Sequence, residues 1–142
     1  MYDLERFVTA QQQDYETALR EIREGRKRSH WMWYIFPQIR GLGHSETARF
    51  YAIQSADEAK AYLEHPVLGQ RLREITHAAL ALSERDPMKI FGWPDNMKFR
   101  SCMTLFAQVC EDDLFEKALI KFFAGQEDSM TLELLEQKGY SL

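Results

Sequence analysis

The six consecutive residues Trp31 to Phe36 (WMWYIF) are all large and apolar or aromatic, and they constrain the fold more than any other stretch. A surface helix or strand must turn a polar face to water, so this run is stable only if protein covers both of its sides. We therefore predict that Trp31, Trp33 and Phe36 are buried in the core. The run is too short for its periodicity to distinguish a strand from a buried helix.

The length of 142 residues fits one domain, and we predict a single domain over residues 1–142. A chain of this size buries about 68–70% of its unfolded surface, which is enough for a core. No apolar run approaches the roughly 20 residues of a membrane span, and the first residues do not resemble a secretory signal. Cys102 and Cys110 lie eight residues apart in one helical pattern, too far for a disulfide. We expect both to be reduced, as in a cytoplasmic protein.

Apolar residues recur at three- and four-residue steps along most of the chain, which is typical of amphipathic helices. Gly25 is placed to end the first helix, Ser55 and Glu58 form a capping box, and Pro66 suits the first position of a later helix. Gly125 and Gly139 are expected to end the last two helices. We predict an all-α fold, a compact orthogonal domain of about six to eight helices with no significant sheet. The helix that starts near Asp95 is expected to be buried over most of its circumference.

The aromatic run has cations on both sides: Arg26 to Arg28 precede it, and Arg40 follows it. Residues 41–46 should begin a new helix, whose free N–H groups attract anions. Cations beside such a helix start predict an anion-binding site. The predicted ligand-binding residues in this segment are Lys27, Arg28, His30, Arg40 and Ser45. An alternative remains open, because Arg26 to Arg28 could simply complete a helix C-terminus.

His44 and Glu46 are the predicted catalytic pair if the chain is an enzyme, since imidazole titrates near neutral pH. A lone histidine beside tryptophans, as His30 is, is more often a hydrogen-bonded core residue than an acid–base group, whereas His44 could equally be a neighbour of the helix cap. The sequence has no His-x-x-x-His or Cys-x-x-Cys spacing, so we predict no metal site, and we expect no cofactor. Phosphate-loop, dinucleotide and nucleophile-elbow signatures are also absent.

A second candidate is the stretch FGWPDNMKFRS, residues 91–101, where Asp95 and Lys98 fall at i and i+3 of a helix. Lys98 would form an exposed ion pair with Asp95, or it would need an anion from a ligand if the helix is buried. We predict that Asp95 and Lys98 bind ligand. We also predict that Lys98 shares one pocket beside the aromatic run with Arg40, His44 and Ser45.

Three blocks resemble a bacterial family of unknown function that is often labelled calpastatin-like: GRKRSHWMWYIFPQIRGLG, EAKAYLEHPVLGQRL and IFGWPDNMKFRSCMTLF. The resemblance implies a small, all-helical, cytoplasmic protein and carries no established activity. We discount the protease inhibition that the label implies, because nothing here resembles a disordered inhibitor repeat. HSETARFYAI and FEKALIKFFAGQEDSMTLELL are loosely similar to the NADAR family, which implies a ligand related to ADP-ribose.

Two functions are therefore considered. The first is binding or hydrolysis of a phosphorylated, nucleotide- or ADP-ribose-like small molecule in a basic pocket beside the aromatic run, as an N-glycosidase-like hydrolase if the chain is an enzyme. The second is a non-catalytic interaction or scaffold protein whose basic segment docks an acidic partner. The net charge of −4 disfavours nucleic acid as a partner. We expect no membrane association, and a monomer or weak homodimer.

Overall fold

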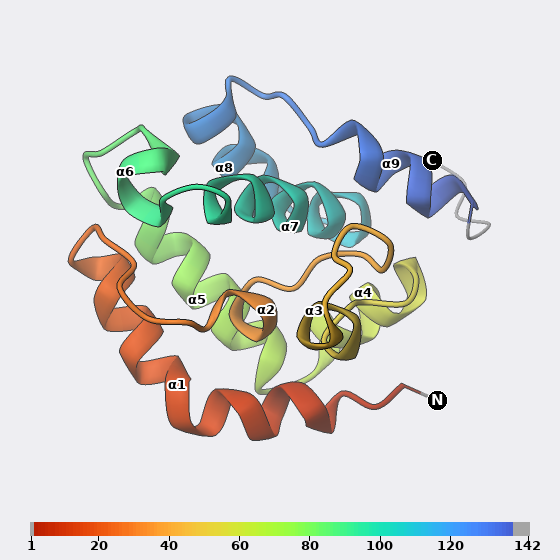
Figure 1. The fold of residues 1–142 in the computed structure, drawn as a ribbon. Coiled ribbons are helices and arrows are strands. Elements are labelled where there is room, and N and C mark those ends of the chain that lie inside the picture. The colour runs from red at the N-terminus through yellow and green to blue at the C-terminus, as the bar shows by residue number, and fades with distance from the viewer. Residues whose placement is uncertain (1, 138–142) are drawn as a thin grey trace.

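The computed structural model describes residues 2–137, which form nine helices and no strand (Figure 1). The all-α prediction is confirmed. Three short segments, within the aromatic run and after residues 45 and 86, each form a helix. The number of helices in residues 2–137 therefore exceeds the six to eight expected. The end predicted at Gly139 lies outside the described residues. The helices are α1 (Glu5–Arg23), α2 (Met32–Ile35), α3 (Glu46–Phe50), α4 (Ala56–Glu64), α5 (Leu68–Leu80), α6 (Pro87–Phe91), α7 (Asp95–Val109), α8 (Leu114–Phe123) and α9 (Ser129–Gln137).

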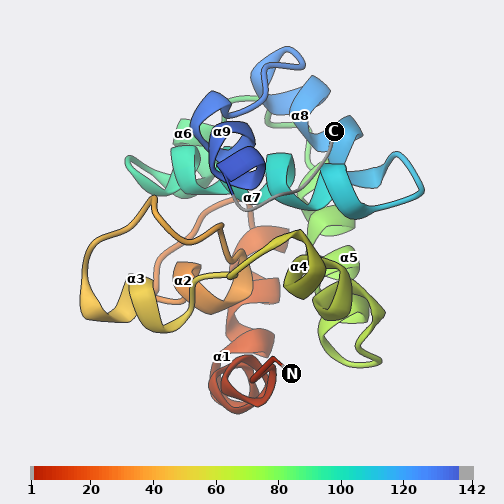
Figure 2. The ribbon, with the colours of Figure 1, turned by 90° about the vertical axis from the view of Figure 1, so that its right-hand side faces the viewer.

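The helices are stacked between α1 on one side and α6 to α9 on the other, with α2 to α5 between them (Figures 1 and 2). The two central helices are α5, which packs on α1, α4 and α8, and α7, which packs on α4, α6, α8 and α9. The middle of α7, residues 101–106, is buried on every side, as predicted. Phe99 of α7 is fully buried, and its ring lies 5.1 Å from that of Phe36 and 4.5 Å from that of Phe91. The aromatic run is thereby joined to the core.

The aromatic run is only partly buried, which corrects the prediction for Trp33. Trp31 and Phe36 are each 1% exposed, whereas Trp33 and Tyr34 are half-buried. The run forms a single helical turn, so consecutive side chains point in different directions and cannot all face the core. Trp33 instead lies on the outer side of α2, where it contacts Lys98.

The helices begin where the sequence signals predicted, except that α5 begins two residues after Pro66. The Ser55 hydroxyl accepts a hydrogen bond from the Glu58 N–H at 3.2 Å, as in a capping box. Pro66 does not occupy the first position of α5, which begins at Leu68. The Nδ1 atom of His65 accepts hydrogen bonds from the N–H groups of Val67 and Leu68 at 3.1 and 3.2 Å, so His65 caps α5 and Pro66 lies in the preceding turn. None of the described helices has both the length and the apolar character needed to cross a membrane.

Both cysteines are free thiols, as predicted, but they differ in accessibility: Cys102 is buried and Cys110 is half-buried. Burial raises the pKa of both thiols, and for Cys110 a hydrogen bond to Asp112 at 3.3 Å acts in the same direction. We therefore expect iodoacetamide to alkylate Cys110 slowly at pH 7 and faster at higher pH, while Cys102 reacts only after unfolding. Peptide mass spectrometry of native and denatured samples measures this. Equal labelling of the two in the native protein would contradict it.

Candidate functional site

The segment between α1 and α2 is organised by Glu21, a residue that the sequence analysis did not single out. The residue is 5% exposed, and its carboxylate accepts hydrogen bonds from the backbone N–H groups of Arg28 and Ser29, at 2.8 and 3.0 Å. It also accepts bonds from the Ser29 hydroxyl at 2.5 Å and the Trp31 indole at 2.9 Å. One buried carboxylate therefore anchors residues 28–31 to α1.

The charge of Glu21 is maintained by these donors. Burial alone would raise the pKa of Glu21, but the hydrogen bonds from Ser29, Arg28 and Trp31 outweigh it and the pKa is lowered. Glu21 is consequently ionised at neutral pH. Its sequence position was informative, because it follows Ala18 by one helical turn on the buried face of α1. An acidic residue on an apolar face requires hydrogen-bond donors.

Three of the predicted ligand-binding residues, Lys27, Asp95 and Lys98, do meet. The Asp95 carboxylate lies 2.8 Å from the Lys27 ammonium and 3.8 Å from the Lys98 ammonium. The Lys27 ammonium is 5.0 Å from the centre of the Trp31 ring, and that of Lys98 is 5.3 Å from the Trp33 ring. Both predicted candidates therefore contribute to one cluster at the start of α7, in which two cations share one carboxylate.

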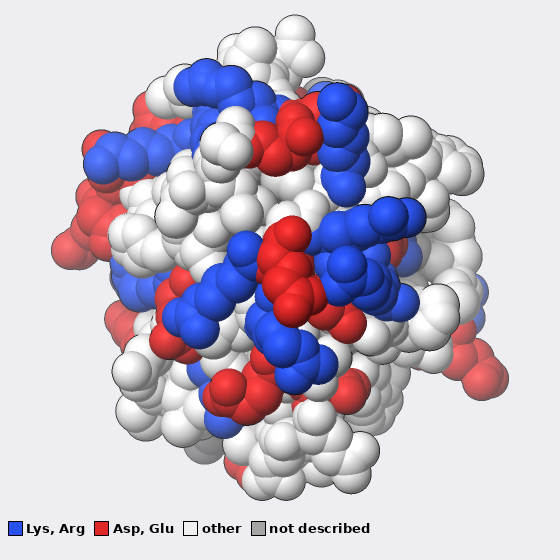
Figure 3. All heavy atoms as spheres, turned by 90° about the vertical axis from the view of Figure 1, so that its left-hand side faces the viewer, with Lys and Arg blue, Asp and Glu red and all other residues white. Residues whose placement is uncertain are grey.

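A cleft of about 480 Å³, here called the basic cleft, opens between the end of α1 and α6. Arg26 and Lys89 are exposed there, and their side chains have no polar partner among residues 2–137. Figure 3 views this side of the molecule and shows Lys and Arg side chains gathered over it, with acidic side chains between them. The residues lining the cleft include three cations and no acid: Arg26, Lys27, Met88, Lys89, Ile90, Phe91 and Gly92.

Arg28, His30 and Arg40 do not line the basic cleft. Arg28 forms a 2.7 Å ion pair with Glu24, and both side chains are exposed, so the pair contributes little to stability. The His30 side chain is exposed rather than placed in the core. Arg40 is exposed and donates a hydrogen bond to the Gln54 amide oxygen at 2.9 Å. These three side chains therefore lie on the surface outside the cleft.

The predicted catalytic residues His44 and Glu46 lie on either side of Ser45 at the start of α3. Ser45 caps this helix by accepting a hydrogen bond from the Ala48 N–H at 3.1 Å. His44 and Glu46 are exposed, and neither side chain has a hydrogen-bond partner in the described part of the chain. Within residues 2–137, no three His, Cys, Asp or Glu side chains gather closely enough to hold a metal ion.

Arg40, His44, Ser45 and Glu46 belong to one loop, residues 40–52, here called the bridge loop. An isolated parallel bridge between Ile39 and Ile53 holds its two ends together. The Arg40 N–H donates to the Ile53 carbonyl at 2.8 Å, and the Ile53 N–H donates to the Gln38 carbonyl at 2.9 Å. Compact loops with adjoining ends are frequently functional.

A second, small cleft lies under the bridge loop, and Lys98 is part of its wall. Its free space of about 10 Å³ suits roughly one water molecule. Of the four residues predicted to share a pocket, Lys98 lines this cleft, whereas Arg40, His44 and Ser45 do not. The lining residues are Met32, Trp33, Phe36, Gln38, Ala48, Tyr51, Ala52 and Lys98.

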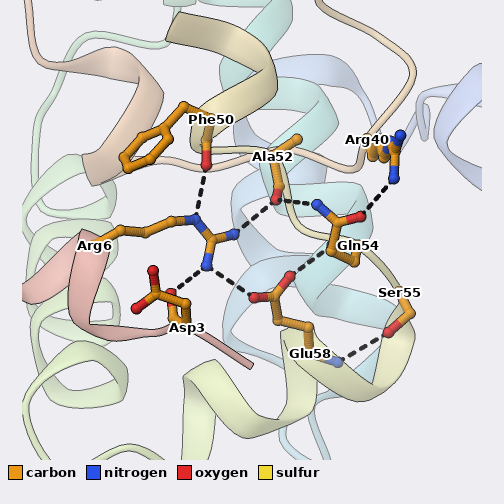
Figure 4. A network of polar contacts seen from close by, with 8 residues as sticks. All are labelled: Asp3, Arg6, Arg40, Phe50, Ala52, Gln54, Ser55 and Glu58. Carbon is orange, nitrogen blue, oxygen red and sulfur yellow. Dashed lines mark hydrogen bonds and ion pairs between the residues drawn. The ribbon is translucent and has the colours of Figure 1, made fainter. Parts of the chain in front are cut away.

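The far end of α3 is held by a buried ion pair that sequence reasoning also missed (Figure 4). Arg6 and Glu58 are 3.0 Å apart, with side chains only 8% and 1% exposed. The Arg6 guanidinium also donates to the carbonyls of Phe50 and Ala52, both at 2.8 Å, and Glu58 accepts from the Gln54 N–H at 2.7 Å. The two side chains thus fasten residues 50–54 to α1 and α4.

The sequence of residues 1–135 matches the family described as protein of unknown function, DUF1810. The chain belongs to the DUF1810 family. The crystal structure of the conserved hypothetical protein Rv1873 from Mycobacterium tuberculosis is similar, with a TM-score of 0.93 and 47% sequence identity, over 95% of this chain and 97% of that one. A search of curated proteins gives no match. The DUF1810 match confirms the resemblance to a family of unknown function, and neither the calpastatin-like label nor the NADAR similarity emerges from these comparisons.

Proposed function

We propose that this DUF1810 protein binds a phosphorylated, nucleotide- or ADP-ribose-like small molecule in the basic cleft. The observation that carries the proposal is a concave site with two unpaired cations, Arg26 and Lys89, and no acidic lining residue. Its volume of about 480 Å³ lies in the range of small-molecule pockets. A guanidinium can donate two parallel hydrogen bonds to a phosphate, so Arg26 is the residue best suited to fix the ligand.

Lys27 would be a third cation for the ligand, besides Arg26 and Lys89, and its ammonium is already held in place. Its side chain is only 8% exposed, and its ammonium is fixed by Asp95 and by the Ser29 carbonyl at 2.5 Å. A cation held in this way loses little conformational entropy when an anion arrives. Asp95 partly neutralises Lys27, so the net attraction for phosphate comes mainly from Arg26 and Lys89.

Hydrolysis is an extension of this proposal. His44 and Glu46 remain the predicted acid–base pair of an N-glycosidase-like reaction, and their exposed position on the bridge loop leaves both side chains accessible to a ligand. Neither lines the basic cleft, so binding is the primary activity proposed. A cytoplasmic location and a monomer or weak homodimer also remain predictions.

A second function, docking of an acidic partner, is favoured by one separate observation. Large apolar side chains are exposed on and after α6, beside the basic cleft: Met88 is 48% exposed, Trp93 73% and Met97 39%. Exposed apolar groups next to cations suit a peptide that carries both acidic and apolar side chains. In that case a short acidic peptide, rather than a nucleotide, would compete for the cleft.

The test is a binding titration with ADP-ribose, AMP and ribose 5-phosphate. Binding is measured by thermal shift and by isothermal titration calorimetry. We expect at least one of these to raise the melting temperature, because it binds only the folded chain. The double variant R26A/K89A should bind about tenfold or more weakly, since each removed cation loses charge-assisted hydrogen bonds.

The matched control is R20A/K117A, which removes one arginine and one lysine from exposed positions on α1 and α8. It should bind as the wild type does. Equal affinity of R26A/K89A and the wild type would refute the cleft as the binding site. Binding of a Glu- and Trp-containing peptide without binding of any phosphate compound would favour the docking function instead.

A further inference from the structure

A groove of about 340 Å³, here called the acidic groove, is formed by the end of α7, by α8 and by the segment between α8 and α9. Figure 2 shows α8 on the side of the molecule opposite α1. The groove shares no lining residue with the basic cleft. Its lining side chains include two carboxylates, those of Glu116 and Glu127, and no cation. The charge of the groove is therefore the reverse of that of the basic cleft.

The apolar part of the acidic groove contains a large side chain that the fold leaves uncovered. Ile120 of α8 is 59% exposed, and Ala107 and Leu119 line the groove with it. A single exposed aliphatic side chain is common on protein surfaces. Here, however, it lies in a concave site that also holds two carboxylates. The groove thus offers an apolar contact and negative charge to the same partner.

Glu127 is held in place at the groove. Its Oε2 atom accepts a hydrogen bond from the Gln108 side-chain amide at 2.7 Å, and the same amide donates to the Thr104 carbonyl of α7 at 3.1 Å. The Oε1 atom of Glu127 has no hydrogen-bond partner among residues 2–137. Glu116, in the first turn of α8, is exposed and has no polar partner in the same part of the chain. Both carboxylates can therefore accept hydrogen bonds from a cation.

The two lysines of α8 are engaged elsewhere. Lys117 forms an ion pair with Asp113 at 3.5 Å. Lys121 donates hydrogen bonds to two carbonyls at and just after the end of α5, those of Leu80 and Leu82. The last turn of α7 contains no basic residue, so no side chain of that turn offsets the negative end of the helix dipole. The electrostatic potential in the groove therefore favours a cationic partner.

We propose that the acidic groove is a docking site for a basic, partly apolar segment of a partner protein. An aliphatic side chain of this segment covers Ile120, and lysines or arginines on either side of it pair with Glu116 and Glu127. Charge complementarity selects this occupant, because an acidic or purely apolar segment would cover the two carboxylates without giving them a counter-ion. The proposal does not depend on ligand binding in the basic cleft.

The probes are three acetylated and amidated peptides that separate charge from apolar character. The first is Lys-Leu-Leu-Lys-Leu-Leu-Lys, the second has serine in place of leucine, and the third has glutamate in place of lysine. Isothermal titration calorimetry at low salt measures their dissociation constants. We expect the first peptide to bind about tenfold or more tightly than either of the others, since it alone matches both the carboxylates and the apolar part of the groove. Added salt should weaken its binding.

The double variant E116Q/E127Q should bind the lysine–leucine peptide about tenfold more weakly, because it removes two ion pairs and keeps the shape of both side chains. The matched control is E5Q/E16Q, which removes two exposed carboxylates of α1 and changes the net charge by the same amount. It should bind the peptide as the wild type does. All four glutamates are exposed, so we expect both variants to fold.

The apolar contact is tested by Ile120→Ser, which should weaken the lysine–leucine peptide about fivefold. Its matched control is Met88→Ser, which removes an exposed apolar side chain of the basic cleft and should leave this peptide unaffected. Melting temperatures of the two variants show that each is folded.

Three results would overturn the proposal. The first is equal binding of the three peptides. The second is equal weakening by E116Q/E127Q and E5Q/E16Q, because net charge alone would then attract the peptide. The third concerns a second copy of the chain as the occupant. Sedimentation velocity that shows dimers of the wild type and monomers of I120S would assign the groove to self-association instead.

Discussion

Replacing Glu21 by alanine should lower the free energy of unfolding by about 3–5 kcal/mol, because it removes the shared acceptor of a buried network. Two backbone N–H groups, the Ser29 hydroxyl and the Trp31 indole would lose their partner. A buried donor left without an acceptor costs about 1–3 kcal/mol, and water can replace only part of this loss. Urea denaturation of the wild type and E21A measures the difference.

The matched variant for this network is Glu21→Gln, which keeps the shape and one acceptor oxygen but has no charge. We expect it to be intermediate in stability. The pKa of Glu21 is lowered by folding, so its contribution is present above the ordinary pKa of an unfolded glutamate and is lost as pH falls through the folded value. Stability of the wild type should therefore fall more steeply in acid than that of E21Q. Parallel pH profiles would show that the charge contributes nothing.

Phe36→Ala should be the most damaging change in the aromatic run, with a loss of about 3–5 kcal/mol. The ring is 1% exposed, and its centre lies 5.1 to 6.1 Å from the rings of Trp31, Phe91 and Phe99, so truncation leaves a cavity at the centre of the core. Chemical denaturation measures this loss in the free energy of unfolding, provided that the variant and the wild type have the same m-value.

The control for Phe36 is Trp33→Ala. Trp33 is the larger side chain, but it is half-buried and its ring faces the Lys98 ammonium, so we expect a loss of no more than about 2 kcal/mol. This ranking reverses the expectation from side-chain size alone. A larger loss for Trp33 than for Phe36 would mean that the outer side of α2 contributes more to stability than its buried side.

Local signals predicted the fold well because each depends on neighbouring residues only. Gly25, with a φ of +83°, follows the end of α1, and the side chain of Ser55 caps α4. The apolar pattern of α7 correctly indicated a buried helix. The orientation of each side chain in the aromatic run was not predictable, since a strand and a single helical turn distribute six apolar residues differently.

The candidate site was predictable only where local spacing determined it. The pairing of Asp95 with Lys98 follows from the i, i+3 relation on a helix. The addition of Lys27 depends on how the end of α1 packs against the start of α7, which no local pattern encodes. Arg26 was recognised only as part of a basic run, and Lys89 was missed, because its relevance arises from the cleft beside α6.

The hydrogen-bond network of Glu21 and the ion pair of Arg6 with Glu58 join residues at very different separations along the chain. Glu21 finds all its donors within the next ten residues, so its network closes only a short loop. Arg6 donates to the nearby Asp3 carbonyl, but its other partners, Phe50, Ala52 and Glu58, lie 44 to 52 residues further along. Closing so long a loop costs more chain entropy than closing a short one. We therefore expect the contacts of Glu21 with residues 28–31 to form before those of Arg6 with residues 50–58.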